Sequence, residues 1–317
     1  MKIALIGPGI MPIPPPGWGA VEILIWDYYT ELTRLGHDVQ IINTKNVQEI
    51  IVSVNAGKFD FVHLHYDVYY FVLDYLKCPT IAITTHYPYI DKPEKHRCDG
   101  YSPIFEFLVK QEKYYNFVLA EKDKETFLRY GANSHYIKKI KNGINSNLFA
   151  FLEKPLYNKT IYLGKITPRK NQAKYQTMTD VDFVGNYDDV NFNRNRSNYL
   201  GEWTREKIHN DLTKYSSLML LSEGEADPLV VKEALIAGLG IVVNKSSAEN
   251  LDTTKDFITI IDDNKLHDRD YIYDKILENR CICEKKRKEI RDYGIFKFDI
   301  SNEVQQYIST ITQIVNE

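Results

Sequence analysis

The amino-acid sequence predicts a protein of two parallel α/β domains. Short apolar strands alternate with longer amphipathic helical segments, which is typical of parallel sheets covered by helices. The alternation stops once, in a polar stretch over residues 142–158, which we interpret as a linker. A length of 317 residues also fits about two ordinary domains. We therefore expect one domain over residues 1–150 and a second that begins at residue 151.

The first domain is predicted from its series of short apolar strands. The clearest amphipathic helix, Val21–Leu35, lies between the first two strands and would end at Gly36 as a helix C-cap. The strands are expected at Ile3–Ile6, Val39–Ile42, Phe61–His65, Thr80–Thr84, Phe117–Ala120 and, with a weaker pattern, Ser134–Ile137.

The second domain repeats this rhythm after the linker. Its strands are expected at Ile161–Gly164, Val181–Gly185, Ser217–Leu221 and Gly240–Asn244. Two segments near the C-terminus, Asp268–Tyr293 and Ser301–Val315, have helical patterns. When two such domains face each other, ligands bind at the C-terminal ends of both sheets, in the cleft between them.

Composition and charge exclude several classes of protein. The net charge of −3 argues against general attraction to DNA or to an anionic membrane. No apolar run approaches the roughly 18 residues of a membrane span, and no signal peptide precedes the first strand, so we expect a cytoplasmic protein. The basic runs Lys138–Lys141 and Lys285–Lys288 are interpreted as solvated faces. Phosphates or lipid headgroups are their alternative ligands, which leaves peripheral membrane contact open.

The sequence does not predict a metal site. Its four cysteines form no C-x-x-C pair and no cluster with zinc spacing. The Asp-x-Asp matches at residues 180–182 and 268–270 are interpreted as turn and cap residues. We therefore expect neither a structural nor a catalytic metal.

The strongest local signal lies between a strand that ends near Leu221 and the helix that follows it. Asp227 and Pro228 read as a helix cap and a first helical residue. The free N–H groups of Leu229 and Val230 would then favour an anion, typically a phosphate. Glu225 precedes this helix and Glu233 lies about two turns into it, so both carboxylates could line one pocket. The alternative is a capped surface helix with solvated carboxylates.

A second signal is the basic loop that follows the strand ending at Gly164. This loop brings Lys165, Arg169 and Lys170 to the same edge of the second sheet. Cations at that edge complement a diphosphate, both in binding and as negative charge develops on a leaving group. The alternative is an ordinary basic loop.

Two further signals lie in the first domain. In the loop after the first strand, Gly17 and Gly19 permit close approach of the backbone to a ligand. This loop is not a dinucleotide fingerprint, because the third glycine is missing and the insertion before the helix is too long. His86 follows the strand Thr80–Thr84, and His63 and His65 lie at the end of an earlier strand. Such histidines project into a cleft or have a structural role.

Together these segments resemble the retaining GT-B glycosyltransferases of family 4, in order and along nearly the whole chain. The matching motifs are Trp18-Gly19-Ala20-Val21-Glu22, Gly36-His37-Asp38-Val39, Val62-His63-Leu64-His65, Thr84-Thr85-His86, Lys141-Asn142-Gly143-Ile144-Asn145, Gly164-Lys165 with Lys170, and Glu225 with Glu233. The resemblance implies two Rossmann-like domains, the second over residues 151–300. It also implies a C-terminal helix, residues 301–317, that packs back on the first domain.

The resemblance also implies a role for each site residue. Lys165 and Lys170 would bind the donor diphosphate, which makes a metal unnecessary, and Leu229 and Val230 would add their N–H groups. Glu225 would contact hydroxyls of the donor sugar, and Glu233 would hold the ribose. The remaining predicted site residues come from the first domain. Gly19 would place its N–H near the diphosphate or acceptor, and His86 would lie beside the donor sugar.

The implied reaction is transfer of a sugar, with retention, from a nucleoside diphosphate sugar to a hydroxyl acceptor. No cofactor beyond this donor is expected, and a UDP-sugar is the default donor. A glycan or a lipid-linked sugar is the expected acceptor, and a modified base in phage-type DNA is an alternative that the net charge disfavours. A nucleotide-sugar epimerase or a non-catalytic nucleotide-sugar binder is the alternative of another class.

Two departures from the family pattern bear on the site. Lys165 replaces the usual arginine, which keeps the charge but loses a two-pronged hydrogen-bonding group. Ala226-Asp227-Pro228 replaces the usual Pro/Gly-Phe-Gly and puts a carboxylate next to the donor. Asp227 would repel a diphosphate unless it caps the helix or binds a sugar hydroxyl.

Overall fold

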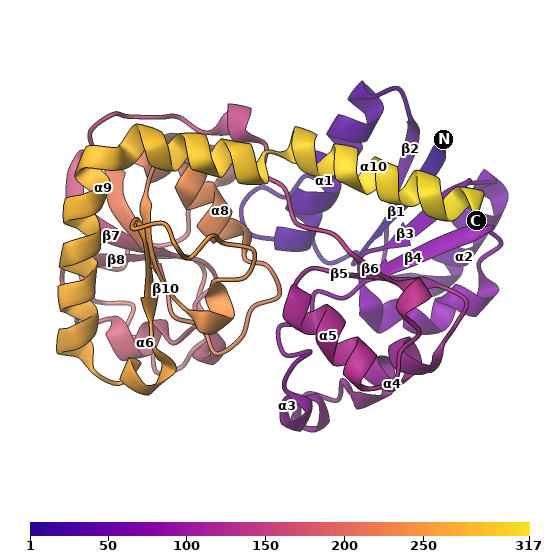
Figure 1. Cartoon of the computed structure of the whole chain (residues 1–317), viewed down its shortest axis with the longest axis horizontal. Helices are drawn as coiled ribbons and strands as arrows, with labels where there is room; N and C mark the ends of the chain where they lie inside the picture. Colours follow the sequence, from indigo (N-terminus) through magenta and orange to yellow (C-terminus); the bar gives the residue numbers. More distant parts are fainter. The chain divides into compact units, whose positions relative to one another are not determined.

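The computed structural model describes all 317 residues, which form two compact units. The first unit comprises Met1–Pro15, Gly19–Gly143 and Ile300–Glu317. The second comprises Pro16–Trp18 and Ile144–Asp299. Each unit is built on one parallel sheet, so the predicted fold class is confirmed (Figure 1).

The first unit has a six-stranded parallel sheet in the order β2-β1-β3-β4-β5-β6. Its strands are β1 (Lys2–Gly7), β2 (Asp38–Asn43), β3 (Phe61–Leu64), β4 (Thr80–Thr84), β5 (Tyr115–Val118) and β6 (Ile137–Lys139). Its helices are α1 (Ala20–Arg34), α2 (Val47–Gly57), α3 (Pro93–Cys98), α4 (Ser102–Lys110), α5 (Glu121–Arg129) and α10 (Ile300–Asn316). A 3₁₀ segment, Asp67–Tyr75, joins β3 to β4.

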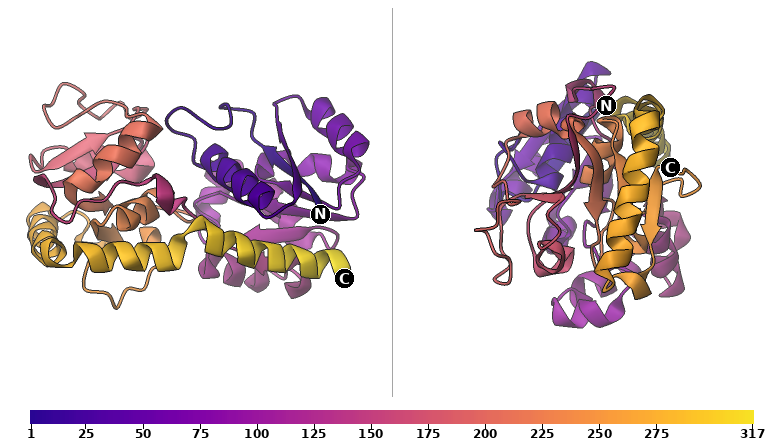
Figure 2. Two further views of the ribbon diagram at one scale, coloured as in Figure 1. Left: turned by 90° about the horizontal axis from the view of Figure 1, so that it is seen from above. Right: turned by 90° about the vertical axis from the view of Figure 1, so that its left-hand side faces the viewer.

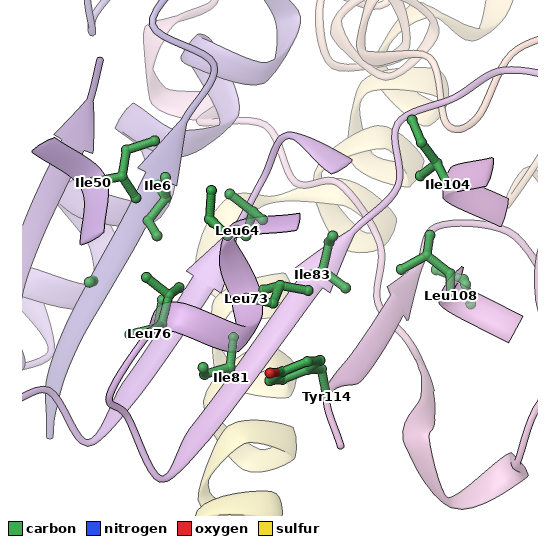
Figure 3. Close-up of a cluster of buried hydrophobic side chains, with 14 of the residues drawn as sticks. Ile6, Ile50, Leu64, Leu73, Leu76, Ile81, Ile83, Ile104, Leu108 and Tyr114 are labelled. Atoms are coloured by element: carbon green, nitrogen blue, oxygen red, sulfur yellow. The ribbon is translucent and has the colours of Figure 1, made fainter. Parts of the chain in front are cut away.

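One face of this sheet holds an aliphatic core. Ile6, Leu64 and Ile83 are in register on adjacent strands and are buried. Figure 3 shows them among side chains from the surrounding helices, with Ile50 of α2 and Leu108 of α4 on either side. Each such side chain contributes about 1.5–3 kcal/mol when it is fully buried.

The other face of the first sheet is covered by α1 and α10. Tyr28 of α1 and Tyr307 of α10 are buried with a ring-centroid distance of 4.7 Å. Tyr307 also forms a hydrogen bond of 2.9 Å with Nδ1 of His63 in β3. The last helix of the chain therefore belongs to the core of the first unit, and both termini lie there (Figure 2).

The second unit has a five-stranded parallel sheet in the order β11-β10-β9-β7-β8. Its strands are β7 (Tyr157–Leu163), β8 (Val181–Val184), β9 (Tyr215–Leu220), β10 (Gly240–Asn244) and β11 (Ile258–Ile261). Its helices are α6 (Gln172–Tyr175), α7 (Arg205–Asp211), α8 (Leu229–Ile236) and α9 (Arg269–Phe298). The long helix α9 runs along one face of the sheet (Figure 2), where the Arg287 guanidinium donates to the carbonyl oxygens of Leu152 and Tyr215 at 2.9 Å each.

Several elements differ from their predicted bounds: β5 lies two residues earlier than predicted, and α9 extends to Phe298. The last strand of the first sheet begins at Ile137 and not at Ser134, because residues 134–136 form a 3₁₀ turn that the Asn133 side chain caps. The strand β11 was not predicted. No helix combines the length with the apolar composition that a bilayer crossing requires.

Candidate functional site

The turn between β9 and α8 differs from its prediction at Asp227. Pro228 is the N-cap residue, in an extended conformation, and α8 begins at Leu229. The Asp227 carboxylate does not cap the helix, so that prediction is wrong. It pairs instead with the buried Lys232 ammonium at 2.5 Å. Lys232 is only 1% exposed and needs a counter-charge, and Asp227 supplies it. The carboxylate thus faces the inside of the unit with its charge balanced.

Leu229 and Val230 are the first two residues of α8. Because a helix leaves its first N–H groups without an intrahelical acceptor, both are available to an anion at this end. The helix ends at Ile236, and Gly238 follows with φ 84°, a left-handed conformation that favours glycine. Leu229 and Val230 thus lie in the first turn of α8, one residue closer to its start than the sequence predicted.

The Glu225 carboxylate is central to a cluster of charges at this edge of the sheet. Its Oε1 atom lies 2.8 Å from Nη1 of Arg169 and 3.5 Å from Nζ of Lys170. Burial opposes ionisation of Glu225, but the charges of Lys170 and Arg169 outweigh it and lower the pKa of the carboxyl. Burial also lowers the pKa of the Lys170 amine, against the attraction of Glu225. The cluster carries two cations and one anion.

Backbone contacts hold this charge cluster in place. Nη1 of Arg169 donates to the carbonyl oxygen of Gly224, and the Glu223 N–H donates to the carbonyl oxygen of Arg169 at 2.9 Å. The Lys170 side chain lies against Gly164, where an added Cβ would come within 3.1 Å of Nζ. Gly164 also has φ 144°, so glycine is needed there for both conformation and space.

Lys165 is outside the charge cluster. Its ammonium lies 3.1 Å from the Asp188 carboxylate and 5.5 Å from the ring centroid of Trp18, both of which are well exposed. Of the two lysines predicted to bind a diphosphate, only Lys170 lies next to Glu225. Arg169 takes the second place beside this carboxylate.

Glu233 belongs to a second ion pair, which the sequence did not predict. Its Oε1 atom accepts a hydrogen bond of 2.7 Å from Nη2 of Arg205, the first residue of α7. The same Nη2 atom lies 3.1 Å from Nε2 of His209. Glu233 is 3% exposed, so the pair is largely shielded from water. The sequence near Glu233 gives no signal for this pair, because Arg205 lies on α7 and Glu233 lies on α8.

Three buried polar atoms near the ends of β7 and β8 have no hydrogen-bond partner. They are Oγ1 of Thr167, Oδ1 of Asn171 and Oδ1 of Asn186. Buried polar groups are nearly always hydrogen-bonded, so each orphan atom needs an explanation. Thr167 and Asn171 flank Arg169 and Lys170 in the loop after β7, and Asn186 lies in the loop after the neighbouring strand β8. A polar ligand at these loops could satisfy all three atoms.

The first unit has a row of histidines at the corresponding edge of its own sheet. The rings of His63 and His65 are 3.8 Å apart between centroids, and His86 lies 6.1 Å from His65. Burial lowers the pKa of His86 to about 4, and it holds those of His63 and His65 well below the usual value. All three imidazoles are therefore neutral at pH 7.

Hydrogen bonding distinguishes these three histidines. His63 bonds both Tyr307 and Thr84, with a distance of 2.6 Å to Oγ1 of Thr84. Neither ring nitrogen of His65 has a partner, and Nε2 of His86 also lacks one. His63 is thus a structural residue, whereas His86, two residues after the end of β4, keeps an unused ring nitrogen.

Gly19, the predicted backbone donor of the first unit, directly precedes α1. It has φ 123°, which favours glycine, and an added Cβ would lie 3.0 Å from Oε2 of Glu22. Burial raises the pKa of Glu22 although backbone N–H groups of Glu22 and Met11 oppose the shift. No three His, Cys, Asp or Glu side chains are arranged to hold a metal ion.

Two Rossmann-like parallel α/β units in one chain define the GT-B class of fold. Sucrose-phosphate synthase from Thermosynechococcus elongatus is similar in structure, with a TM-score of 0.80 at 14% identity over 99% of each chain. Alr3699/HepE of Anabaena in complex with UDP-glucose matches with a TM-score of 0.72 at 15% identity, over 99% of this chain and 100% of that one.

A third similar structure is WaaG, a glycosyltransferase involved in lipopolysaccharide biosynthesis. Its TM-score is 0.69 at 13% identity, over 98% of this chain and 99% of WaaG. No protein-family profile and no curated protein sequence matches the chain. At such low identities the likeness shows a shared fold.

Proposed function

We propose that this protein is a retaining glycosyltransferase of family 4 that moves a sugar from a nucleoside diphosphate sugar to a hydroxyl acceptor. The observation that carries the proposal is the cluster of Glu225, Arg169 and Lys170 beside the start of α8. A diphosphate needs cations and free N–H groups, and this edge of the sheet offers both. UDP-glucose bound to the similar Alr3699/HepE makes a UDP-sugar the first donor to test.

In the proposed complex, Lys170 and Arg169 bind the diphosphate together with the N–H groups of Leu229 and Val230. Lys165, at the margin, makes a weaker contribution. Fixed cations stabilise the negative charge that develops on a leaving diphosphate, which is the task of a metal ion in other transferases. The bound diphosphate would compete with Glu225 for the two cations. Glu225 would then be free to accept hydrogen bonds from hydroxyls of the donor sugar.

The remaining roles are proposed from position in the fold. Glu233 would hold the ribose hydroxyls, and the N–H of Gly19 would approach the diphosphate or acceptor. His86, neutral at pH 7, would contact the donor sugar through its unused ring nitrogen. We propose retention by attack from the side of the leaving group, where a phosphate oxygen takes the acceptor proton. A glycan or a lipid-linked sugar is the proposed acceptor.

The test uses the double variant Glu233→Ala, Lys170→Ala and a panel of UDP-, GDP- and ADP-sugars. Free nucleotide released by transfer or hydrolysis is measured by chromatography. Each lost charge-assisted contact is worth roughly 1.5–3 kcal/mol, so each substitution should lower the rate at limiting donor by about 10- to 100-fold.

The matched control for this test is Lys207→Gln. It removes an ammonium that pairs with Asp211 on the exposed side of α7 and should leave the rate unchanged. Turnover that survives intact in the double variant would show that the assigned roles are wrong. An isomerised nucleotide sugar without released nucleotide would instead identify an epimerase.

A further inference from the structure

The ion pair of Arg205 and Glu233 has a geometry that affects how Glu233 can bind a ligand. A carboxylate has two oxygen atoms, and only Oε1 of Glu233 is used by the guanidinium, at 2.7 Å. No hydrogen bond within the protein reaches Oε2. The side chain is therefore fixed through one oxygen atom, while the other stays available to a donor group.

Arg205 has further contacts at its backbone and at its side chain. Its backbone N–H donates to the carbonyl oxygen of Pro16 at 3.1 Å, and it begins α7 directly after Thr204, whose hydroxyl caps that helix. His209 lies one turn further along the same helix face, with Nε2 at 3.1 Å from Nη2 of Arg205. The guanidinium itself contacts Glu233 and His209 in the absence of any ligand.

His209 adds no charge to this group of residues. Burial and the Arg205 charge lower its pKa to about 4, against the opposing effect of Glu233. The imidazole is neutral at pH 7 and can accept a hydrogen bond from the guanidinium. The charges of Arg205 and Glu233 therefore balance each other, so a ligand group that binds Oε2 of Glu233 does not need to be positively charged. A neutral donor such as a hydroxyl suits Oε2 best.

We propose that Arg205 is a positioning residue that sets the specificity for ribose over deoxyribose. It orients Glu233 so that Oε2 accepts a hydrogen bond from the ribose 2′-hydroxyl of the donor nucleotide. This inference rests on the proposed function, because it takes the ribose contact of Glu233 as given. Without Arg205 the carboxylate rotates freely and loses its preference for the hydroxyl.

The test compares three nucleotide pairs by calorimetry: UDP with 2′-deoxy-UDP, GDP with 2′-deoxy-GDP and ADP with 2′-deoxy-ADP. The measured quantity is the ratio of the two dissociation constants in the pair that binds best. For the unmodified protein we expect the ribonucleotide to bind about 10-fold tighter or more, as for a hydroxyl held by a charged acceptor. In Arg205→Gln this ratio should fall to that of Glu233→Gln, close to one.

Arg205→Lys keeps the positive charge but lacks the planar fork, so its ratio should lie between those of Arg205→Gln and the unmodified protein. It serves as the measured variant if Arg205→Gln does not fold. Lys207→Gln, on the same helix, should leave the ratio unchanged.

The two hypotheses fail in different ways. In one outcome, Arg205→Gln weakens the binding of both nucleotides of a pair equally and keeps the ratio of dissociation constants, while Glu233→Gln brings this ratio close to one. Arg205 then has only a structural role, and this inference is wrong. If no nucleotide binds, or if Glu233→Gln keeps the ratio, the proposed ribose contact of Glu233 is wrong and the inference falls with it.

Discussion

The two sheets of this protein keep polar side chains buried in different ways. In the first unit, His63 and His65 are buried and His86 is half-buried, and all three are neutral imidazoles at pH 7. In the second unit, enclosed acidic and basic side chains are held as ion pairs, as in Asp227 with Lys232 and Glu233 with Arg205. Neutral imidazoles are suited to hydrogen bonds with uncharged hydroxyl groups. A basic side chain that is paired with a carboxylate can instead pair with the phosphate of a ligand.

The largest effect should come from Lys232→Met, which leaves the buried Asp227 carboxylate without its counter-charge. Breaking a buried pair in this way costs about 3–5 kcal/mol in the free energy of unfolding. Urea unfolding at pH 7 measures this loss. Replacing both partners, as in Asp227→Leu with Lys232→Met, should restore most of the stability, since no unpaired charge remains. Equal stability of the single variant and the unmodified protein would contradict the enclosed pair.

Acidification should weaken the first unit through its neutral histidines. The pKa of His86 is about 4 in the folded protein, against about 6.5 in an unfolded chain, so between these values the proton binds preferentially to the unfolded state. The stability associated with a neutral His86 is complete above pH 6.5 and is lost as the pH falls toward 4. The free energy of unfolding should therefore drop by up to about 2 kcal/mol per such histidine between pH 7 and pH 5.

Variants separate this effect from the titration of other groups. His86→Gln should show a smaller drop between pH 7 and pH 5 than the unmodified protein, as should His65→Leu. His135→Gln changes a histidine whose side chain is 49% exposed and should leave the drop unchanged. A drop that is the same in all four proteins would show that the buried histidines do not cause it.

Tyr307→Phe should have an intermediate effect. It removes the hydroxyl that bonds Nδ1 of His63 and leaves a buried ring nitrogen unpaired, which costs about 1–3 kcal/mol. Tyr75→Phe is the control, because Tyr75 is 65% exposed. Urea unfolding of both variants provides the comparison, and identical midpoints would argue against the hydrogen bond between α10 and β3.

Lys165→Gln should have the smallest effect on stability. Its partner Asp188 is 69% exposed, and exposed ion pairs contribute about 0–1 kcal/mol. Nucleotide affinity should also fall less than in Lys170→Gln, because Lys170 lies beside Glu225 and Lys165 does not. Calorimetry with UDP measures this difference. A larger loss in Lys165→Gln would assign the main diphosphate contact to Lys165.

Most of the fold could be predicted because the hydrophobic pattern indicates the helices and strands, and residues such as glycine mark where they end. Gly36 and Gly238 lie just past the ends of α1 and α8, and both have the positive φ that is typical at the C-terminal end of a helix. The missed strand β11 has a signal in its run of β-branched residues, Ile258–Ile261, but it is short. The strand at Ser134 was misplaced because the side-chain cap of Asn133 favours a turn there.

The site could be predicted only where its residues are close in sequence. Glu225, Leu229 and Glu233 share one loop and helix, and a spacing pattern finds them. The pairing of Glu233 with Arg205 depends on tertiary packing, because the two residues lie on different helices and local sequence patterns do not connect them. Asp227 and Lys232 are close in sequence, but their pairing depends on the burial of Lys232, which the local pattern did not indicate. The expected cap at Asp227 failed because a buried lysine attracts a carboxylate more strongly than free N–H groups do.

The position of α10 affects how the chain acquires its structure during synthesis. Residues 144–299 of the second unit are continuous in the sequence, so that part can fold as soon as it leaves the ribosome. The first unit, although translated first, lacks Tyr307 until the last 18 residues, Ile300–Glu317, emerge. We expect the N-terminal sheet to remain partly open, with His63 uncovered, until Ile300–Glu317 can pack against it.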